Sequence, residues 1–343
     1  VEQVLKRKIG EEKFDALTPH QQTNACTHIF GGCCCHKDLN VVQYGYKSIQ
    51  RTYSTHDLPA PVLLANKANS ATIDIGGDDP NNPAVQNAIK ASSSGAIKLL
   101  QLIGALLRNK DENKGYQDKC NHFMRDRKLE LYDLGIAQTR KFPDVSNTRY
   151  GCYTYAAAEV LVDEIIDGKT NSGVPNHMEL NIQKGLNCPV TMTELVALAL
   201  YGVSVSWPYM VMVRGTKENP INLLSLTDLH RKLPEFCTNI AANPHILLDP
   251  TMTPLEELTI DRQPFRGHLL LDAILELQPD LPNLFLIISR MFSGAETGWI
   301  IFTPEFHVGG TFDKLTPKQR AVLFIPATND CSEGMLGSLR VHM

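Results

Sequence analysis

Thiol and imidazole groups are densest near the beginning of the chain, where residues 31–38 read GGCCCHKD. Cys33 and His36 are separated by two residues, a spacing at which a thiolate and an imidazole can share one face and bind zinc. A closed zinc site needs four ligands. The candidates for the second pair are Cys26 with His28 and Cys120 with His122. Neither pair has zinc-finger spacing, so the pattern favours cysteines buried as small apolar groups over a zinc site.

A redox role for one of these thiols is a weaker alternative. His36 or Lys37 can activate a neighbouring thiol by favouring its ionised form. Adjacent cysteines, however, seldom have the geometry of an unstrained disulfide. The sequence therefore gives a redox site less support than simple packing.

A carboxylate near the end of the chain is the second candidate for chemistry. Asp330 or Ser332 can cap a helix, which places Glu333 in its first turn, where a negative charge complements the helix dipole. A plain helix start is the simpler interpretation from spacing alone. The alternative is that Glu333 binds a divalent cation together with other acidic groups.

Composition places these candidates in an ordinary globular protein, with 43% hydrophobic and 20% charged residues among 343. The net charge of -4 provides no overall basic field, so any nucleic-acid contact must be local.

No stretch approaches about 18 consecutive apolar residues, and we expect no membrane span. An odd number of cysteines, nine, indicates a reducing intracellular compartment. The chain begins at Val1 without an apolar leader, and we expect it to be a piece of a longer product.

Most of the chain has apolar residues at helical spacing, so the sequence predicts a mainly α protein in which helices position the candidate residues. Residues 1–25 have helical spacing, with Thr18-Pro19 as the start of a new helix, and a short helix is expected through 28–30. Pro208 is expected to kink or split the helix that contains it. The further predicted helices cover residues 95–107, 147–168, 191–212, 226–240, 269–277 and 281–302. Strand-like alternation is confined to 72–75 and 322–325, and the Pro-, Gly- and Asn-rich stretch 54–94 predicts a mobile linker.

Three segments carry a resemblance to a known family. Residues 33–40 read CCCHKDLN, residues 142–150 read FPDVSNTRY, and residues 325–333 read IPATNDCSE. The first resembles the Cys-x-x-His motif of hAT-type transposases, and more closely a segment of the fungal Kyakuja-Dileera-Zisupton transposases. The second resembles that family's Thr-Arg-Trp-like segment, with Tyr150 in the aromatic place. The third is similar to the closing motif, in which a Ser-Glu pair opens a helix.

The resemblance implies an RNase H-like core that uses two Asp and one Glu to bind two divalent metals, Mg²⁺ or Mn²⁺. A large all-helical insertion separates the second Asp from the Glu in that family. The expected fold is therefore a helical insertion domain with a remnant of an RNase H-like core at the two ends. The implied division is 1–53 with the Cys-x-x-His motif, 54–94 as linker, 95–320 as insertion, and 321–343 as the closing strand and helix. Glu333 would be the third catalytic, metal-binding carboxylate, and His36 would stand beside it in the active site.

The chain also departs from the family pattern. The first catalytic Asp has no counterpart, the second is not matched, and Asp15 lies in a helical context without a family match. Gly334 stands where the family often has Arg. One carboxylate does not hold two metals, so we expect this chain alone to be inactive. Arg149 and Lys37 are the candidate contacts to DNA phosphate, although a solvated surface residue explains Arg149 equally well.

Two hypotheses about function follow. The first is a fragment of a transposase-like protein for metal-dependent DNA strand cleavage and transfer, with transposon ends as its partner, in the nucleus or another reducing intracellular compartment. The second is a helical scaffold or interaction protein, a domesticated or decaying transposon remnant, in which Cys33 and His36 serve packing or one structural zinc. An oligomer is compatible with both. The first hypothesis requires His36 and Glu333 to converge, whereas the second does not.

Overall fold

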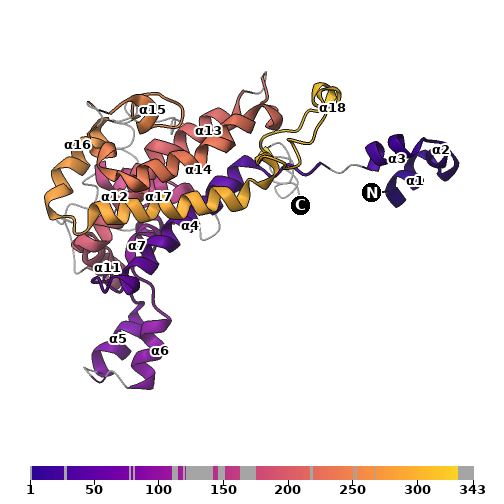
Figure 1. The fold of residues 1–343 in the computed structure, drawn as a ribbon. Helices are drawn as coiled ribbons and strands as arrows, with labels where there is room; N and C mark the ends of the chain where they lie inside the picture. Colours follow the sequence, from indigo (N-terminus) through magenta and orange to yellow (C-terminus); the bar gives the residue numbers. More distant parts are fainter. Residues whose placement is uncertain are drawn as a thin grey trace.

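The computed structural model describes residues 2–26, 29–76, 79, 82–109, 115–118, 120, 142–145, 151–162, 175–216, 219–249, 251, 253–266 and 268–330. Within them the protein is mainly α-helical (Figure 1), as the sequence predicted. The described residues form two isolated β-bridges, Leu63 with Ser94 and Asn222 with Pro326, and no sheet. An RNase H-like core requires a sheet, so the expected remnant of that core is not found in the described parts of the two ends.

Two long helices form the spine of the body. The helix α4 (Cys34–Thr55) runs along α17 (Leu284–Phe302), and α14 (Thr227–Ala242) packs against the other side of α17 (Figure 1). Glycines make the close approach possible, because a Cβ atom at Gly294 would lie 2.6 Å from the carbonyl oxygen of Tyr44. A side chain there would push the two backbones apart.

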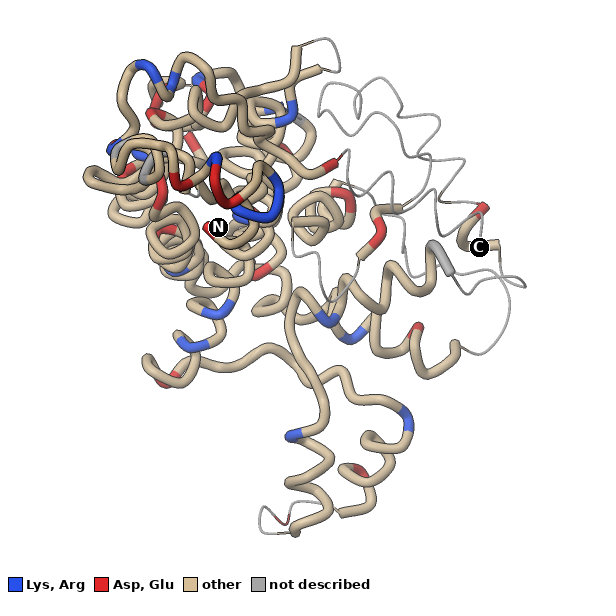
Figure 2. The backbone as a smooth tube through the Cα atoms, turned by 90° about the vertical axis from the view of Figure 1, so that its right-hand side faces the viewer, with Lys and Arg blue, Asp and Glu red and all other residues tan. Residues whose placement is uncertain are grey.

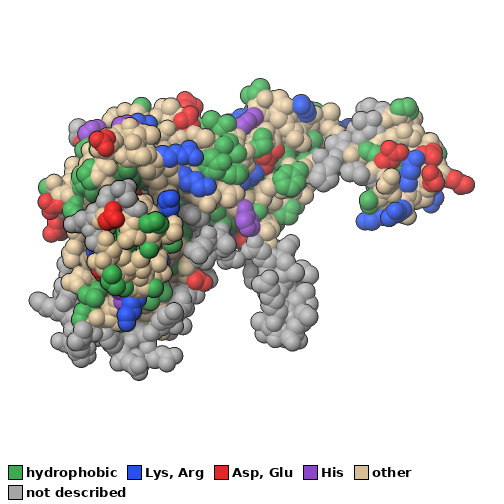
Figure 3. All heavy atoms as spheres, turned by 90° about the horizontal axis from the view of Figure 1, so that it is seen from below, with side chains coloured by type: hydrophobic (Ala, Val, Ile, Leu, Met, Phe, Trp, Pro, Cys, Tyr) green, Lys and Arg blue, Asp and Glu red, His purple; other side chains and the backbone are tan. Residues whose placement is uncertain are grey.

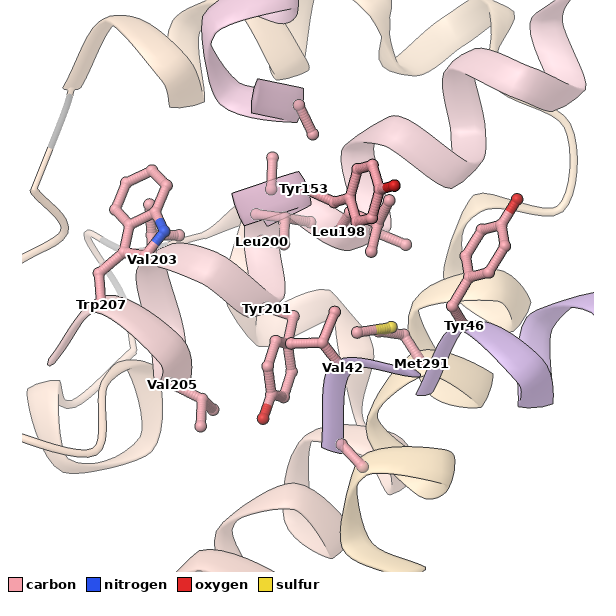
Figure 4. Packing of buried hydrophobic residues seen from close by; sticks show 14 of the residues in the cluster. Val42, Tyr46, Tyr153, Leu198, Leu200, Tyr201, Val203, Val205, Trp207 and Met291 are labelled. Atoms are coloured by element: carbon pink, nitrogen blue, oxygen red, sulfur yellow. The ribbon is translucent and has the colours of Figure 1, made fainter. Parts of the chain in front are cut away.

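The centre of the core is α12 (Pro189–Tyr201), which contacts α10 (Gly151–Val162), α17 and α7 (Gly95–Gly104). Figure 4 shows Tyr201 of α12 beside Val42 of α4. The helix continues through a π-helical segment, η2 (Gly202–Ser206), into α13 (Trp207–Arg214). The helix is therefore disturbed next to Pro208, as expected. A proline ring clashes with the carbonyl four residues earlier, and the backbone hydrogen bonds change here from the α to the π pattern.

The remaining helices lie around this core, except α18, which stands off the body in Figure 1 and buries no residue. The capping boxes of Asn176 on α11 and Thr316 on α18 fix where these two helices begin. The additional α-helices are α11 (His177–Leu186), α15 (Leu255–Leu258), α16 (His268–Leu277) and α18 (Pro317–Val322). The short helical segments are η1 (Ala105–Asn109, π), η3 (Leu223–Leu226), η4 (Pro244–Leu248), η5 (Gln278–Asp280) and η6 (Pro304–Phe306).

Three short helices begin the chain: α1 (Glu2–Ile9), α2 (Glu11–Asp15) and α3 (Pro19–Cys26). They stand away from the body in Figure 1. The start of α3 at Pro19 agrees with the predicted cap, since the backbone N–H of Gln21 donates to Thr18 Oγ1 at 3.3 Å. The helix expected through 28–30 is wrong for Ile29 and Phe30, which are not helical.

The stretch predicted as a linker, 54–94, contains two helices, α5 (Lys67–Gly76) and α6 (Pro83–Lys90). They pack against each other and project from the body in Figures 1 and 2. The strand predicted for 72–75 is therefore wrong, because these residues lie within α5. Side chains of the turn-forming type act here as helix caps: Asn82 Oδ1 accepts a bond from the N–H of Ala84 at 3.0 Å, and Pro83 occupies the first turn of α6.

Two helical stretches, Pro189–Arg214 and Leu284–Phe302, are long and apolar enough to cross a membrane, by length and composition alone. Buried positions make up 83% of the apolar window of the first and 50% of the second. The interior position of the first stretch is sufficient reason for its apolar composition. The expected absence of a membrane span stays a prediction.

Candidate functional site

Two of the three family-like segments, residues 33–40 and 325–333, line one pocket of about 240 Å³, which we call the motif pocket. The walls come from α4, α10, the η2–α13 helix and the residues just before the end of the described chain. The second family-like segment, 142–150, has no residue in the lining, but Gly151, Cys152 and Tyr155, which follow it, do line the pocket. The lining residues are Cys35, His36, Asp38, Leu39, Gly151, Cys152, Tyr155, Ser206, Met210, Arg214, Asn329 and Asp330.

The start of α4 is fastened to the closing segment. The N–H of Cys34 donates to the carbonyl oxygen of Ala327 at 2.9 Å, and Cys33 Sγ lies within hydrogen-bond distance of the Asn329 side-chain amide, 3.0 Å from its Oδ1. The first amides of a helix have no partner within the helix, so the Ala327 carbonyl satisfies one of them. These two bonds join residues 33–34 to residues 327–329 and form one side of the motif pocket.

The closing segment is held from its other side by residues just before η3. The N–H of Leu223 donates to the Ile325 carbonyl at 2.7 Å, and the side-chain amide of Asn222 donates to the Leu323 carbonyl at 2.9 Å. This pairing replaces the strand predicted for 322–325: Val322 ends α18, and the next three residues belong to no strand. A single bridge to Asn222 is sufficient to fix the segment against the body.

Asp38 is the buried acid of the motif pocket, with 2% of its surface exposed. Its Oδ2 accepts a bond from Ser206 Oγ at 2.6 Å, while its buried Oδ1 has no hydrogen-bond partner. Burial raises the pKa of Asp38 to about 7, and the Ser206 hydroxyl opposes part of that increase. A carboxyl group in this state exchanges its proton near neutral pH.

The three consecutive cysteines lie in three different environments. Cys33 precedes the first turn of α4, and the pKa of its thiol is lowered to about 4, chiefly by a bond from the Cys35 thiol and also by the backbone N–H of His36. Cys34 is buried beside His230, and burial raises its pKa to about 11. The pKa of Cys35 is raised, first by its interaction with Cys33. Only Cys33 therefore has the character of a thiolate.

Lys37 does not lie where a phosphate contact requires it. Its ammonium group is buried and pairs with Glu305 at 2.5 Å, and it also donates to the Phe302 carbonyl at 2.9 Å. The interpretation of Lys37 as a DNA contact is corrected by this ion pair, since the charge is directed into the protein between the start of α4 and η6. Its position on the buried side of an amphipathic helix is the physical reason.

The rim of the motif pocket carries the charges that solvent can reach. His36 is exposed there, in the first turn of α4. Arg214, at the end of α13, lies with its Nε 3.7 Å from Asp330 Oδ2, and their side chains are 57% and 51% exposed. This ion pair links two walls of the pocket and leaves the guanidinium accessible to an anion.

Gly151 lets α10 approach α4 at the base of the motif pocket. A Cβ atom there would lie 2.7 Å from Leu39 Cδ2 and 3.5 Å from Asp38 Oδ2. Because both contacts are to side chains of the first turns of α4, a larger residue would reduce the space around the carboxyl group. This close approach brings the start of α10 to the first family-like segment.

Two of the residues named from the sequence, Glu333 and Arg149, lie outside the described residues. The convergence of His36 with Glu333 therefore stays a prediction, although Asp330, three residues earlier, lines the same pocket as His36. Among the described residues, no group of three or more His, Cys, Asp or Glu side chains is placed to hold a metal ion. The zinc interpretation of Cys33 and His36 has no second ligand pair within this part of the chain.

The sequence reasoning assigned no role to Asp38, Ser206 or Arg214. For Asp38 a signal was present: it lies four residues after Cys34 and three before Val41, on the face that α4 buries. A carboxyl group on an apolar face is unusual and indicates a specific partner or a functional site. Ser206 and Arg214 have no comparable pattern, because only the tertiary fold brings α13 to α4.

The motif pocket thus combines the Asp38 carboxyl group, which titrates near neutral pH, with the accessible guanidinium of Arg214 and the exposed imidazole of His36. The thiolate of Cys33 lies nearby. Such a set can bind an anion at the rim and exchange a proton at the base. Comparison with protein-family models, with curated proteins and with solved structures finds no match to this chain.

Proposed function

We propose that the chain belongs to a transposase-like DNA-processing protein, and that the motif pocket receives the phosphate backbone of a DNA end beside the strand-cleavage centre. The observation that carries this proposal is the meeting, at one pocket, of the first and third family-like segments with residues that directly follow the second. Cys35 and His36, Gly151 and Cys152, and Asn329 and Asp330 come from three distant parts of the sequence. A scaffold protein has no need of this convergence.

The charges at the rim support a phosphate rather than a neutral ligand. Arg214 offers a guanidinium that is more than half exposed, and guanidinium groups bind phosphate through paired N–H donors. Basic and acidic residues are otherwise interspersed along the chain and on the surface seen in Figures 2 and 3. Binding would accordingly be local to the pocket, as expected from the net charge of -4.

The acidic groups do not complete a metal centre within the described residues. Asp38 has one buried oxygen without a hydrogen-bond partner, and Asp330 is paired with Arg214. The family resemblance adds Glu333 as a metal-binding carboxylate, but a two-metal site needs further acids. The proposed activity of this chain alone is therefore DNA binding without strand cleavage, with Mg²⁺ or Mn²⁺ belonging to the intact enzyme.

The test is a binding titration of a fluorescent hairpin-ended DNA duplex, with the same samples assayed for nicking in Mg²⁺ and in Mn²⁺. We expect binding that weakens with salt, and no nicking. Arg214→Ala should weaken binding and reduce the slope of log K against log salt by about one, the value for a lost phosphate contact. Lys232→Ala is the matched control, because Lys232 is exposed on α14 and lies outside the pocket lining.

Each outcome bears on the proposal. Equal effects of Arg214→Ala and Lys232→Ala would mean that the pocket does not receive DNA. Absence of any DNA binding at low salt would favour the helical scaffold instead. Strand cleavage that this chain catalyses and that Glu333→Gln abolishes would contradict the inactivity proposed for the chain alone.

A further inference from the structure

One face of α4 stays open to solvent along most of the helix, and it begins at the motif pocket. His36, which lines the pocket, is followed on this face by Asn40, Gln43, Lys47 and Arg51, at spacings of three or four residues. Gln43 is partly exposed and the other four are exposed. Positions 11 apart (47 minus 36) differ by about 20° around the axis of an α-helix, so Lys47 stands nearly in line with His36. We call these five residues the α4 stripe.

The exposed charges of α4 are all positive. Its charged residues are Lys37 and Asp38, which are buried, and Lys47 and Arg51, which are exposed. The remaining residues of the α4 stripe carry an imidazole and two side-chain amides, which can also donate to an anion. In a chain with a net charge of -4, this helix is therefore a local exception that attracts negative charge.

Both exposed cations of α4 lack an acidic partner. In the part of the chain that the structure describes, neither Lys47 nor Arg51 forms an ion pair. The ammonium group of Lys47 lies 5.8 Å from the ring centre of Tyr44, which is partly buried and holds the lysine side chain on the helix surface. An aromatic ring does not neutralise a cation, so both side chains can contact a phosphate.

Arg290 adds a third cation beside the end of the α4 stripe. Helix α17 runs along α4 (Figure 1), and Nη2 of Arg290 lies 3.3 Å from His56 Nε2, just after the last turn of α4. A guanidinium only donates hydrogen bonds, so His56 Nε2 is the acceptor and this imidazole is neutral. The positive charge of Arg290 is therefore directed at a neutral ring and adds to the charges of Lys47 and Arg51.

The α4 stripe has the length of a short piece of DNA. His36 and Arg51 are 15 residues apart (51 minus 36), which corresponds to about 22 Å along the axis of α4. B-form DNA rises about 3.4 Å per base pair, so this distance spans about six or seven base pairs. A duplex that begins at the motif pocket and lies along α4 would reach Lys47 after about five base pairs.

We propose that the DNA duplex whose end lies at the motif pocket continues along the α4 stripe, where Lys47 and Arg51 contact its phosphates and Arg290 flanks them. This inference rests on the proposed function, which places the DNA end at the pocket. The positive charge and the continuity with the pocket favour a partner that carries negative charge over the whole length of the stripe, as a duplex does. Such contacts fix the direction of the duplex and do not read its sequence.

The test measures the affinity of a blunt duplex of about 30 base pairs at several salt concentrations. Lys47→Ala combined with Arg51→Ala should weaken binding and lower the slope of log K against log salt by about two, because each lost phosphate contact lowers it by about 0.9. The matched control combines Lys13→Ala with Lys232→Ala, on α2 and α14, and should leave both quantities nearly unchanged. All four residues are exposed on helices, and alanine favours helix, so both double variants should fold.

Uncharged phosphates locate the contact along the duplex. Methylphosphonates placed about five to seven base pairs from each end should weaken binding to the wild-type chain. The double variant of Lys47 and Arg51 should bind this duplex as well as the unmodified one, since the contacts in question are already absent. The same replacement at the centre of the duplex is the control and should weaken binding less.

The outcomes separate this inference from the proposed function. An effect of Arg214→Ala without an effect of the Lys47 and Arg51 double variant would overturn the inference and leave the proposed function standing. The reverse result would overturn the proposed function, and with it the course of the duplex from the pocket. Equal weakening by the two methylphosphonate positions would overturn the inference. Displacement of the duplex by poly-L-glutamate as readily as by unlabelled duplex would overturn DNA as the partner of the stripe.

Discussion

The carboxyl group of Asp38 and the hydroxyl group of Ser206 lie 2.6 Å apart, although 168 positions separate them in the sequence. This bond connects the first turns of α4 to the π-helical segment before Pro208. It satisfies Oδ2 of the carboxyl group and leaves Oδ1 buried without a hydrogen-bond partner. The stability of the protein should therefore depend on whether Asp38 carries a proton.

The first prediction concerns Asp38→Asn and pH. The folded-state pKa of Asp38, about 7, is above its ordinary value of 3.8, so the folded protein holds this proton more tightly than the unfolded chain. Stability from this group is full at low pH and is lost as pH rises from about 4 to about 7. A shift of this size corresponds to at most about 4 kcal/mol. Urea unfolding should show the wild type losing stability relative to Asp38→Asn over this range, and parallel curves would contradict it.

The second prediction concerns the buried ion pair of Lys37 and Glu305. Lys37→Met leaves the Glu305 carboxylate buried without its cation, and we expect a loss of about 3 to 5 kcal/mol in the free energy of unfolding. Asp313→Asn, which breaks the partly exposed pair with Arg231, should cost less than about 1 kcal/mol. Equal losses in chemical unfolding would show that Lys37 is not held in the interior.

The third prediction concerns the crossing of α4 and α17. Gly294→Ala places a Cβ atom against the Tyr44 carbonyl, where backbone must move, and we expect a loss of about 1 to 3 kcal/mol. Thr297→Ala, on the exposed face of the same helix, is the control and should change the free energy of unfolding by less than about 0.5 kcal/mol. Thermal unfolding that separates the two variants in this order supports the helix contact, and the reverse order refutes it.

The fourth prediction concerns the thiol of Cys33. Because its pKa is lowered to about 4, alkylation by iodoacetamide should proceed at a nearly constant rate between about pH 6 and pH 8. Cys35→Ala removes the largest cause of that shift and should slow the reaction at the lower pH. Cys34 and Cys237, whose pKa values are raised by burial, should react last. Peptide mass spectrometry gives the rates, and a Cys33 rate proportional to hydroxide concentration would contradict the prediction.

Much of the helical fold could be predicted from the sequence. The periodic segments 226–240, 269–277 and 281–302 correspond to α14, α16 and α17, because amphipathic spacing and proline punctuation are local signals. The stretch 54–94 was predicted as a linker because local signals are ambiguous there. Its Asn and Pro residues favour turns in isolation, but in the folded protein they stand at the starts of α5 and α6. No helix was predicted over Cys34–Thr55, although α4 buries apolar residues at helical spacing, among them Val41, Val42, Tyr46 and Ile49.

The site could be predicted only in part. His36 lines the motif pocket and Cys33 contacts Asn329 in its wall, but the burial of Lys37 depends on Glu305, 268 positions away. Likewise, the raised pKa of Asp38 follows from burial under α10 and η2, which no local pattern reports. The burial of Lys37 and the raised pKa of Asp38 both arise from contacts between segments far apart in the sequence, and such contacts leave no local sequence pattern.

The central claim is that a DNA end lies at the motif pocket, and disulfide trapping at Cys33 tests it most directly. A DNA duplex that carries an activated-disulfide tether near its end is compared with the same tether reagent without DNA. If the pocket receives the duplex, DNA raises the effective concentration of the tether, and Cys33 should cross-link faster than with free reagent. Excess unlabelled duplex or Arg214→Ala should remove the acceleration. Equal Cys33 rates with and without DNA would contradict the claim.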